Sequence, residues 1–200
     1  MGDLINQLDL HKKNVLDIGC YDGTLLSRLR NKDNNLWGIE ANPYLTSRAI
    51  KKGVQVKNFL LTDETRLPFH NGFFELVIAG EFIEHVYDPV HFLKEVRRVL
   101  APKGKLLIST PNLASLSRRC MLFLGINPFI EPSLDEPDSV GHIRYYTFKI
   151  LERLLNQQKF QVIERRSDVL NLSNTGQLRL PLLPKLLPHF GQSIIFLAGK

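Results

Sequence analysis

The sequence has few cysteines and no long apolar run, and each absence narrows the class of protein. Only two cysteines, Cys20 and Cys120, occur among the 200 residues, which is too few for a disulfide framework. A reducing, cytoplasmic compartment is therefore expected. No stretch approaches the roughly 20 apolar residues that cross a bilayer, and the first residues, MGDLINQLDLHKK, lack the apolar core of a signal peptide. We expect no transmembrane segment.

The sequence also lacks long runs of basic residues. Residues 1–100 hold 13 basic and 13 acidic side chains, whereas residues 101–200 hold 13 and 7, so the net charge of +6 belongs to the second half. Such an excess suits an anionic partner, either nucleic acid or a membrane surface. However, no run of four Lys or Arg occurs, and aromatic residues are not interleaved with the basic ones as a stacking surface requires. A scattered basic surface is the simpler interpretation.

Apolar runs alternate with helical patterns along the whole chain. Strands are predicted at residues 15–18, 36–39, 54–60, 74–79, 105–109, 160–165 and 193–198, and helices at 24–30 and 44–52, after Asp88 and after Thr147. This alternation predicts an α/β fold, a parallel sheet with helices on both faces. We expect one domain over residues 1–200. Ligands of such sheets bind beyond the carboxyl ends of the strands.

A glycine-bearing turn follows the first predicted strand in the stretch VLDIGCYDG. A dinucleotide loop needs three glycines, but here only Gly19 and Gly23 are present, and the Cβ of Tyr21 would crowd a pyrophosphate. Asp17, at the strand end, suits a ligand with an amino group or a cationic centre. Glu40 closes the next strand, where its carboxylate can accept hydrogen bonds from two ribose hydroxyls.

Five segments, taken in order, resemble the class I S-adenosylmethionine-dependent methyltransferases. They are VLDIGCYDG, WGIEANP, LTDETRLPF, FELVIAGEFIEHVYDP and LKEVRRVLAPKGKLLISTPN, and together they span residues 15–112. The resemblance implies a Rossmann-like, seven-stranded, mostly parallel sheet whose last strand is antiparallel. It also implies S-adenosyl-L-methionine as the cofactor.

The resemblance assigns a set of residues to the cofactor. In this set Asp63 meets the adenine amino group and Glu64 flanks the ring. Tyr21 departs from the commoner glycine and would lie beside the methionine moiety. The full set of expected cofactor-binding residues is Asp17, Gly19, Cys20, Gly23, Glu40, Ala41, Asp63 and Glu64.

Two carboxylates and an imidazole follow the fourth predicted strand. In a helical turn, Glu81, Glu84 and His85 would share a face and could hold a divalent cation such as Mg²⁺. The pattern E-x-x-E-H resembles that of two metal-dependent branches of the family, the ubiquinone-biosynthesis O-methyltransferases and the small-RNA 2′-O-methyltransferases. A His85 that orients the substrate or acts as a general base is the alternative interpretation.

A second histidine, His142, lies in the stretch GHIRYYT, which resembles a segment of many small-molecule methyltransferases. It is a further candidate base or ligand; the alternative interpretation is that His142 and Arg144 only pair with nearby backbone or acids. Asn112 follows the fifth predicted strand and is expected to face the methyl acceptor. The remaining histidines with no such context, interpreted as surface or packing residues, include His70, His91 and His189.

Two apolar segments flank this predicted site. Residues 113–146 are long and irregular in pattern, and we expect them to form an insert or lid over the active site. Residues 178–190, LRLPLLPKLLPHF, are interrupted by proline and cannot form one regular helix. They could close the pocket, seat a partner or touch a membrane surface peripherally.

The sequence therefore predicts an S-adenosylmethionine-dependent methyltransferase that acts on a small molecule, most readily at oxygen. His85 or His142 would handle the acceptor proton. Two alternatives stay open: an RNA 2′-O-methyltransferase, and a non-catalytic binding module built on the same fold.

Overall fold

The computed structural model describes residues 1–200 except 9, 30–32, 63–64, 129–140, 172–178 and 181–186. The main sheet contains β1 (Asn14–Ile18), β2 (Asn35–Glu40), β3 (Gln55–Asn58), β4 (Phe74–Gly80), β5 (Leu100–Pro111), β6 (Gln161–Arg166) and β9 (Ser193–Gly199). The helices are α1 (Gly2–Gln7), α2 (Thr24–Ser27), α3 (Pro43–Lys51), α4 (Pro89–Val99), α5 (Leu116–Phe123) and α6 (Phe148–Gln157). Smaller elements are the 3₁₀ turns η2 (Ile83–His85) and η3 (Pro188–Phe190) and the short strands β7 (Leu170–Asn171) and β8 (Arg179–Leu180).

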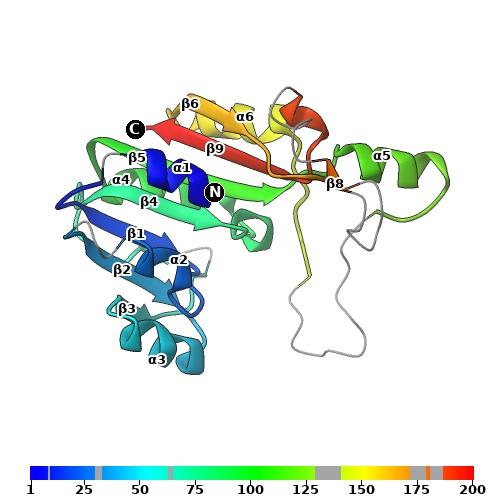
Figure 1. Cartoon of the computed structure of the whole chain (residues 1–200). Helices are drawn as coiled ribbons and strands as arrows, with labels where there is room; N and C mark the ends of the chain where they lie inside the picture. Colours follow the sequence, from blue (N-terminus) through cyan, green and yellow to red (C-terminus); the bar gives the residue numbers. More distant parts are fainter. Residues whose placement is uncertain (9, 30–32, 63–64, 129–140, 172–178, 181–186) are drawn as a thin grey trace.

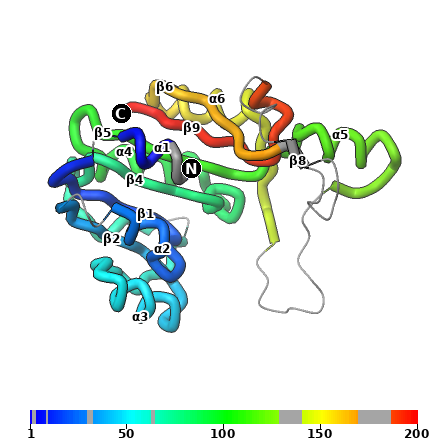
Figure 2. The backbone as a smooth tube through the Cα atoms, in the orientation of Figure 1, coloured from blue at the N-terminus to red at the C-terminus, as the bar shows by residue number. Residues whose placement is uncertain are grey.

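The sheet has the strand order β3-β2-β1-β4-β5-β9-β6, which Figures 1 and 2 show from one edge to the other. The first five of its strands in chain order run parallel, and β9 pairs antiparallel with both β5 and β6. The predicted sheet, with its antiparallel last strand, is therefore confirmed. Across the described residues, no helix is long and apolar enough to cross a membrane.

Helices cover both faces of the sheet, as the alternating pattern predicted. Successive residues of β4 point to opposite faces, so Val77 and Ala79 pack with α4 and α6, whereas Leu76 and Ile78 pack with α1, α2 and α3. Because β4 is apolar on both sides, it lies at the centre of the two cores. The predicted N-cap Asp88 is confirmed, since its side chain accepts two backbone N–H groups, and Asn42 caps α3 in the same way although it was not predicted to.

Some element boundaries differ from the sequence prediction. β5 was expected to begin at Lys105, but its pairing with β4 already starts at Leu100 and resumes at Lys105 after a bulge. The bulge is tight, because a Cβ on Gly104 would lie 2.8 Å from the Ala101 carbonyl oxygen. Helix α1 was not predicted; its burial of Leu4 and Ile5 against the sheet compensates for its short length.

Part of the predicted irregular insert is helical. Helix α5 has no buried residue, and Phe123 at its end is 90% exposed. Figure 1 shows α5 projecting beyond the end of the sheet. The segment that follows includes residues 129–140, so this part of the expected lid lies outside the described residues, as do residues 178 and 181–186 of the apolar segment 178–190.

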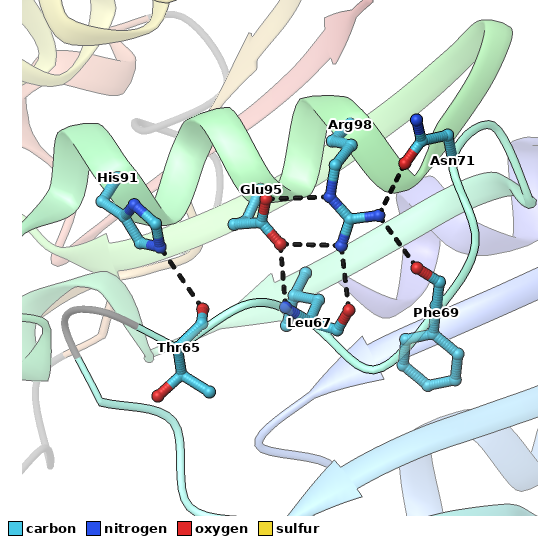
Figure 3. Close-up of polar contacts among 7 residues, drawn as sticks. All are labelled: Thr65, Leu67, Phe69, Asn71, His91, Glu95 and Arg98. Atoms are coloured by element: carbon cyan, nitrogen blue, oxygen red, sulfur yellow. Dashed lines mark hydrogen bonds and ion pairs between the residues drawn. The ribbon is translucent and has the colours of Figure 1, made fainter.

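One arginine fixes the segment between β3 and β4 onto helix α4 (Figure 3). Arg98 donates to both carboxylate oxygens of Glu95 and to the carbonyl oxygens of Leu67 and Phe69, and a further bond reaches Asn71 Oδ1. These contacts use all five guanidinium donors. Burial alone would raise the pKa of Glu95, but the hydrogen bonds from Arg98 and from the Leu67 amide outweigh it and lower that pKa.

Gly38 lies in β2 directly beneath the Cys20 side chain. A Cβ at position 38 would lie 2.4 Å from Cys20 Sγ and 3.1 Å from Cys20 Cβ. We expect Gly38→Ala to lower the free energy of unfolding by about 1–3 kcal/mol through this overpacking, measured by urea denaturation. Cys20→Ala in the same chain should restore part of the loss, because it removes Sγ. Gly199→Ala, where the nearest atom is 3.4 Å away, is the matched strand control; an equal loss there would contradict the steric explanation.

Candidate functional site

Polar side chains gather at the carboxyl ends of the parallel strands. Asp17 stands near the end of β1, Glu40 ends β2, and Glu81 follows β4. Ser109 and Thr110 lie near the end of β5. Since these strands run side by side in the same direction, their ends bring residues from the whole first half of the chain to one edge of the sheet.

The glycine turn after β1 is held by backbone hydrogen bonds to β2. The amides of Gly19 and Cys20 both donate to the Ile39 carbonyl oxygen, at 2.9 and 3.0 Å. Gly19 and Gly23 have φ values of +73° and +75°, which glycine adopts without strain. A Cβ on Gly19 would lie 2.9 Å from the Phe82 ring, and Gly23 packs as closely against Ala49. Both glycines are therefore required by space as well as by conformation.

Glu40 connects the two loops at this edge. Its Oε2 accepts the Tyr21 amide at 3.0 Å, and its Oε1 accepts the Asn42 amide at 2.9 Å. Each carboxylate oxygen keeps a second lone pair. Two fixed acceptor oxygens side by side match the pair of hydroxyls on a ribose, which is the role predicted for Glu40.

Burial sets the ionisation of Asp17 and Cys20. Asp17 is only 4% exposed, and its pKa is raised well above the usual value by burial and then by the nearby charge of Glu40. Burial, Asp17 and Glu40 together raise the pKa of the Cys20 thiol to about 12, so it stays protonated and unreactive. A cationic ligand here would offset the cost of ionising Asp17.

Three further cofactor predictions have different outcomes. Ala41 is exposed next to Glu40, and its carbonyl oxygen accepts a hydrogen bond from Asn58. Asp63 and Glu64, predicted to contact the adenine, lie outside the described residues.

Tyr21 occupies a backbone conformation that favours glycine. Its φ is +52°, in the left-handed region, and its side chain is 62% exposed. This explains physically why a glycine is the commoner residue at this point of the turn. The Tyr21 amide donates to Glu40, so the residue acts through its backbone whatever its side chain.

The two glutamates after β4 diverge to opposite faces of the sheet. The Ser109 hydroxyl donates to Glu81 Oε1 at 2.7 Å, and the Thr110 hydroxyl donates to Glu84 Oε2 at 2.9 Å. Ser109 and Thr110 are neighbours in β5, so their side chains point to opposite faces. The predicted helical face shared by Glu81, Glu84 and His85 is therefore not formed: η2 begins only at Ile83, and Glu81 has a φ of +49°.

Residues 141–146 pair with the turn η2, although they are far from it in sequence. The carbonyl oxygen of Glu84 accepts the amides of Ile143 and Arg144, both at 3.1 Å. The Arg144 side chain donates to the carbonyl oxygens of Val86 and Tyr87. The predicted pairing of Arg144 with nearby backbone is thus confirmed.

This pairing brings His142 against His85. The ring centroids are 4.9 Å apart in an edge-to-face arrangement. His85 Nδ1 lies 3.3 Å from the Gly141 carbonyl oxygen. A carbonyl oxygen only accepts, so Nδ1 carries the proton in this contact and Nε2 is left as a basic lone pair. Burial, then the charges of His85 and Arg118, lower the pKa of His142.

A set of possible metal ligands is present among the described residues, but it is not the predicted one. Glu84, His85 and His142 each offer one ligand atom, and the three atoms lie within 4.8 Å of one another. Glu81 does not belong to this set; its carboxylate is bonded to Ser109, on the other face of the sheet from Thr110 and Glu84. Glu84 is fully buried, and its Oε1 has no hydrogen-bond partner. Burial raises the Glu84 pKa to about 7.

A cavity of about 270 Å³ borders His85. Its walls come from the segment after β3, from the loop after β4 and from the first turns of α4. The lining residues are Leu61, Thr62, Thr65, Phe82, His85, Val86, Tyr87, Asp88, His91, Phe92 and Glu95. Of the described residues of the predicted lid 113–146, none is part of the lining. The lining does include His91, predicted to be a surface or packing residue, whose Nε2 contacts the Thr65 carbonyl oxygen at 3.3 Å (Figure 3).

The prediction that Asn112 faces the acceptor is wrong. Asn112 is fully buried, and its amide donates to the carbonyl oxygens of His189 and Gly191, while its Oδ1 accepts the Ala114 amide. All the functional groups of the side chain are used to tie the end of β5 to η3. The rings of Phe148 in α6 and His189 in η3 also pack edge to face, with their centroids 4.8 Å apart. This contact agrees with the packing role expected for His189.

One charged residue near this site was not singled out from the sequence. Arg118 in α5 is half-buried, and it donates to the Asn112 carbonyl oxygen at 2.7 Å. Its charge acts on both Glu81 and His142. The sequence signal was weak, because Arg118 and Arg119 stand together in a segment whose helical structure was not predicted.

The fold and this edge of the sheet define the class of protein: a mostly parallel sheet covered by helices on both faces, with a glycine turn after its first strand and an acid, Glu40, at the end of its second. The model of a family described as "Methyltransferase domain" matches residues 1–165. The chain belongs to this family, and it carries an S-adenosylmethionine-dependent methyltransferase domain.

Individual relatives agree with the family. The chain is 32% identical over 107 residues to a ubiquinone biosynthesis O-methyltransferase of Sodalis glossinidius, a match that covers 52% of this chain and 43% of that protein. The chain therefore matches less than half the length of this curated relative. An S-adenosylmethionine-dependent methyltransferase structure from Mesorhizobium loti is similar with a TM-score of 0.72 at 16% identity, covering 99% of this chain and 96% of the other. A structure from Thermotoga maritima, described as a possible histamine N-methyltransferase, gives 0.68 at 20% identity, covering 100% and 87%. These two structural similarities support the assignment of the fold.

Asp17→Asn tests the cost of the buried carboxyl. The pKa of Asp17 is raised by folding, so the stability linked to its proton is present below its ordinary pKa, about 4, and is lost as the pH rises through the raised value. We expect Asp17→Asn to raise the Tm of the ligand-free protein at neutral pH, with a smaller effect in acid, and to weaken S-adenosylmethionine binding. Calorimetry from acid to neutral pH measures both effects.

Asp88→Asn is the control of opposite sign. Backbone hydrogen bonding from His91 lowers the Asp88 pKa, so its stabilisation is present above the ordinary pKa and is lost as the pH falls. A change in Tm for Asp17→Asn that does not depend on pH would contradict the interpretation.

Tyr21→Gly tests the left-handed turn. Glycine removes about 1–2 kcal/mol of strain but costs about 0.4–1 kcal/mol through the unfolded chain, so the folded state should lose no stability. S-adenosylmethionine affinity should be kept or improved, measured by titration calorimetry. Tyr21→Ala removes the ring but keeps Cβ, so it should be the less stable of the two variants. Complete loss of binding in Tyr21→Gly would mean that the loop holds something else.

Proposed function

We propose that this protein transfers a methyl group from S-adenosylmethionine to an oxygen of a small-molecule acceptor, with His85 as the general base. The observation that carries the proposal is His85 itself: it borders the cavity, and because its Nδ1 contacts the Gly141 carbonyl oxygen, Nε2 is the ring nitrogen that can serve as the base. When bound, S-adenosylmethionine supplies a methyl group that is already activated on a sulfonium. The protein has to align the acceptor and remove its proton.

The residues at the edge of the sheet divide these tasks. Glu40 would accept the ribose hydroxyls, Asp17 would face the cationic part of the cofactor, and the loop Gly19–Gly23 would let it approach the backbone. Cys20, Ala41, Asp63 and Glu64 belong to the same proposal. In the reaction the acceptor oxygen would form its bond to the methyl carbon as the carbon–sulfur bond breaks, and the acceptor proton would move to His85 Nε2.

His142 assists this step. Its lowered pKa keeps it neutral beside His85, so it can receive a hydrogen bond from the acceptor or share the proton. A divalent cation such as Mg²⁺ is the second form of the proposal. A buried carboxylate oxygen and two imidazole nitrogens are suitable donors for such an ion, and Glu84, His85 and His142 would hold it.

A small molecule fits better than RNA as the acceptor. The cavity at His85 is about 270 Å³ and is lined in part by apolar side chains. Basic residues do gather in a groove formed by Lys94, Arg97, Arg98, Lys159 and Lys200. This groove follows α4 from Val90 to Arg98, and among the described residues it shares no lining residue with the cavity at His85.

Two further contacts are proposed for the apolar segments that flank the site. Residues 113–146 would close over the acceptor after it binds, and residues 178–190 would make a peripheral contact with a membrane surface. Flotation with anionic vesicles tests the second contact. Both cysteines are free, Cys20 buried and Cys120 exposed, which supports a cytoplasmic compartment.

The proposal is tested by incubating the protein with labelled methyl donor and a metabolite extract. We expect label in a low-mass product, and a rate lowered by about 10²–10⁴-fold in His85→Gln with cofactor binding unchanged. His70→Gln, an exposed histidine away from the cavity, is the matched control. No binding of S-adenosylmethionine in calorimetry would instead favour the non-catalytic module, and label in RNA would favour the RNA alternative.

A chelator decides between the two forms of the proposal. If a divalent cation takes part, EDTA and Glu84→Gln should both abolish turnover, and added Mg²⁺ should restore it only in the wild type. Full activity in EDTA would remove the cation and leave His85 acting as a base.

A further inference from the structure

Arg98 and Arg118 differ in how many of their hydrogen-bond donors are satisfied by the protein. The five donors of Arg98 are all satisfied by protein acceptors, as a purely structural arginine requires. Arg118 makes one hydrogen bond, to the Asn112 carbonyl oxygen, and within the described part of the chain no carboxylate lies within 4.0 Å of its guanidinium. Four of its donor positions are thus left for another acceptor.

The position of Arg118 gives these donors a direction. The bond to Asn112 anchors the guanidinium at the carboxyl end of β5, next to the edge where Ser109 and Glu81 meet. Its charge is felt by His142 and by Glu81, and the His142 ring contacts the His85 ring. The Leu113 amide donates to the Tyr146 carbonyl oxygen at 2.9 Å, so the end of β5 to which Arg118 is bonded lies beside the segment that carries His142.

Partial burial disfavours the charged form of Arg118 when no anion is bound to it. Burial lowers the pKa of Arg118, while Glu81 and Tyr145 raise it. A half-buried guanidinium with four donor positions not used by the protein is suited to a planar, two-oxygen anion, which it can bind through two parallel hydrogen bonds. Ser109 already holds the Glu81 carboxylate by a hydrogen bond at 2.7 Å.

We propose that Arg118 is the binding site for an anionic group of the methyl acceptor, a carboxylate or a phosphate, positioned so that the acceptor's hydroxyl reaches His85. The inference rests on the proposed function. The inference extends the proposed function by giving the acceptor a chemical class. The acceptor is a hydroxylated molecule with a negative charge on the side of α5, rather than a neutral lipid-like quinol.

The experiment uses three aromatic probes that differ in charge: benzoate, phenyl phosphate and the neutral benzamide. Each is titrated into the full-length protein in EDTA, and the ring signals of His142 and His85 are followed by NMR. We expect saturable shifts with benzoate or phenyl phosphate and none with benzamide. The stronger of the two anions identifies the group as carboxylate or phosphate.

Variants assign the effect to the residue. Arg118→Gln should weaken binding of the anion by about tenfold or more, and Arg118→Lys should weaken it less, because it keeps the charge but loses the two-pronged geometry. Arg153→Gln removes the same charge from an exposed position of α6 and should change binding less than about twofold. Thermal melting of each variant separates a folding defect from a binding defect.

Equal shifts with benzoate and benzamide, no shift with any probe, or unchanged anion binding in a folded Arg118→Gln would overturn the inference. Titration of the wild type with S-adenosylmethionine distinguishes this from failure of the proposed function. Cofactor binding without anion binding removes only the role of Arg118, whereas anion binding without cofactor binding removes the methyl transfer.

Discussion

The pair Glu95–Arg98 on helix α4 is the interaction on which the architecture of the cavity depends. The chain between β3 and β4 has no regular structure in its described part, so its carbonyl groups need partners from elsewhere. Arg98 donates to two of these carbonyl oxygens, those of Leu67 and Phe69, and to the Asn71 side chain, while Glu95 accepts the Leu67 amide. The same helix begins at Pro89, shortly after His85. The segment after β3, which forms one wall of the cavity, is therefore bonded directly to α4, which forms another wall.

The carboxylates at the edge of the sheet explain why such rigid support is needed. Asp17, Glu40 and Glu84 are brought together by the ends of parallel strands, and burial raises the pKa values of Asp17 and Glu84. Such groups lower the stability of the ligand-free protein, as buried ionisable groups at functional sites generally do. The two large cores on either side of β4 supply the compensating burial.

The sequence predicted what depends on local pattern. The strands, the cap at Asp88 and the position of Glu40 follow from periodicity and from the glycine turn, and all are found. Contacts between distant segments were not predictable in this way. Nothing in the letters EFIEH shows that Glu81 and Glu84 would be drawn apart by Ser109 and Thr110. Likewise, the role of Asn112 was misjudged because its partners in η3 lie almost eighty positions further along the chain.

The two amide bonds from Ile143 and Arg144 to the Glu84 carbonyl oxygen have a wider consequence. They join residues 141–146, from the second half of the chain, to the turn that follows β4. Under the proposed function, substitutions in this short segment would alter which acceptor is bound while the loop after β1 remains as it is. A new substrate could then be acquired during evolution without loss of the methyl donor.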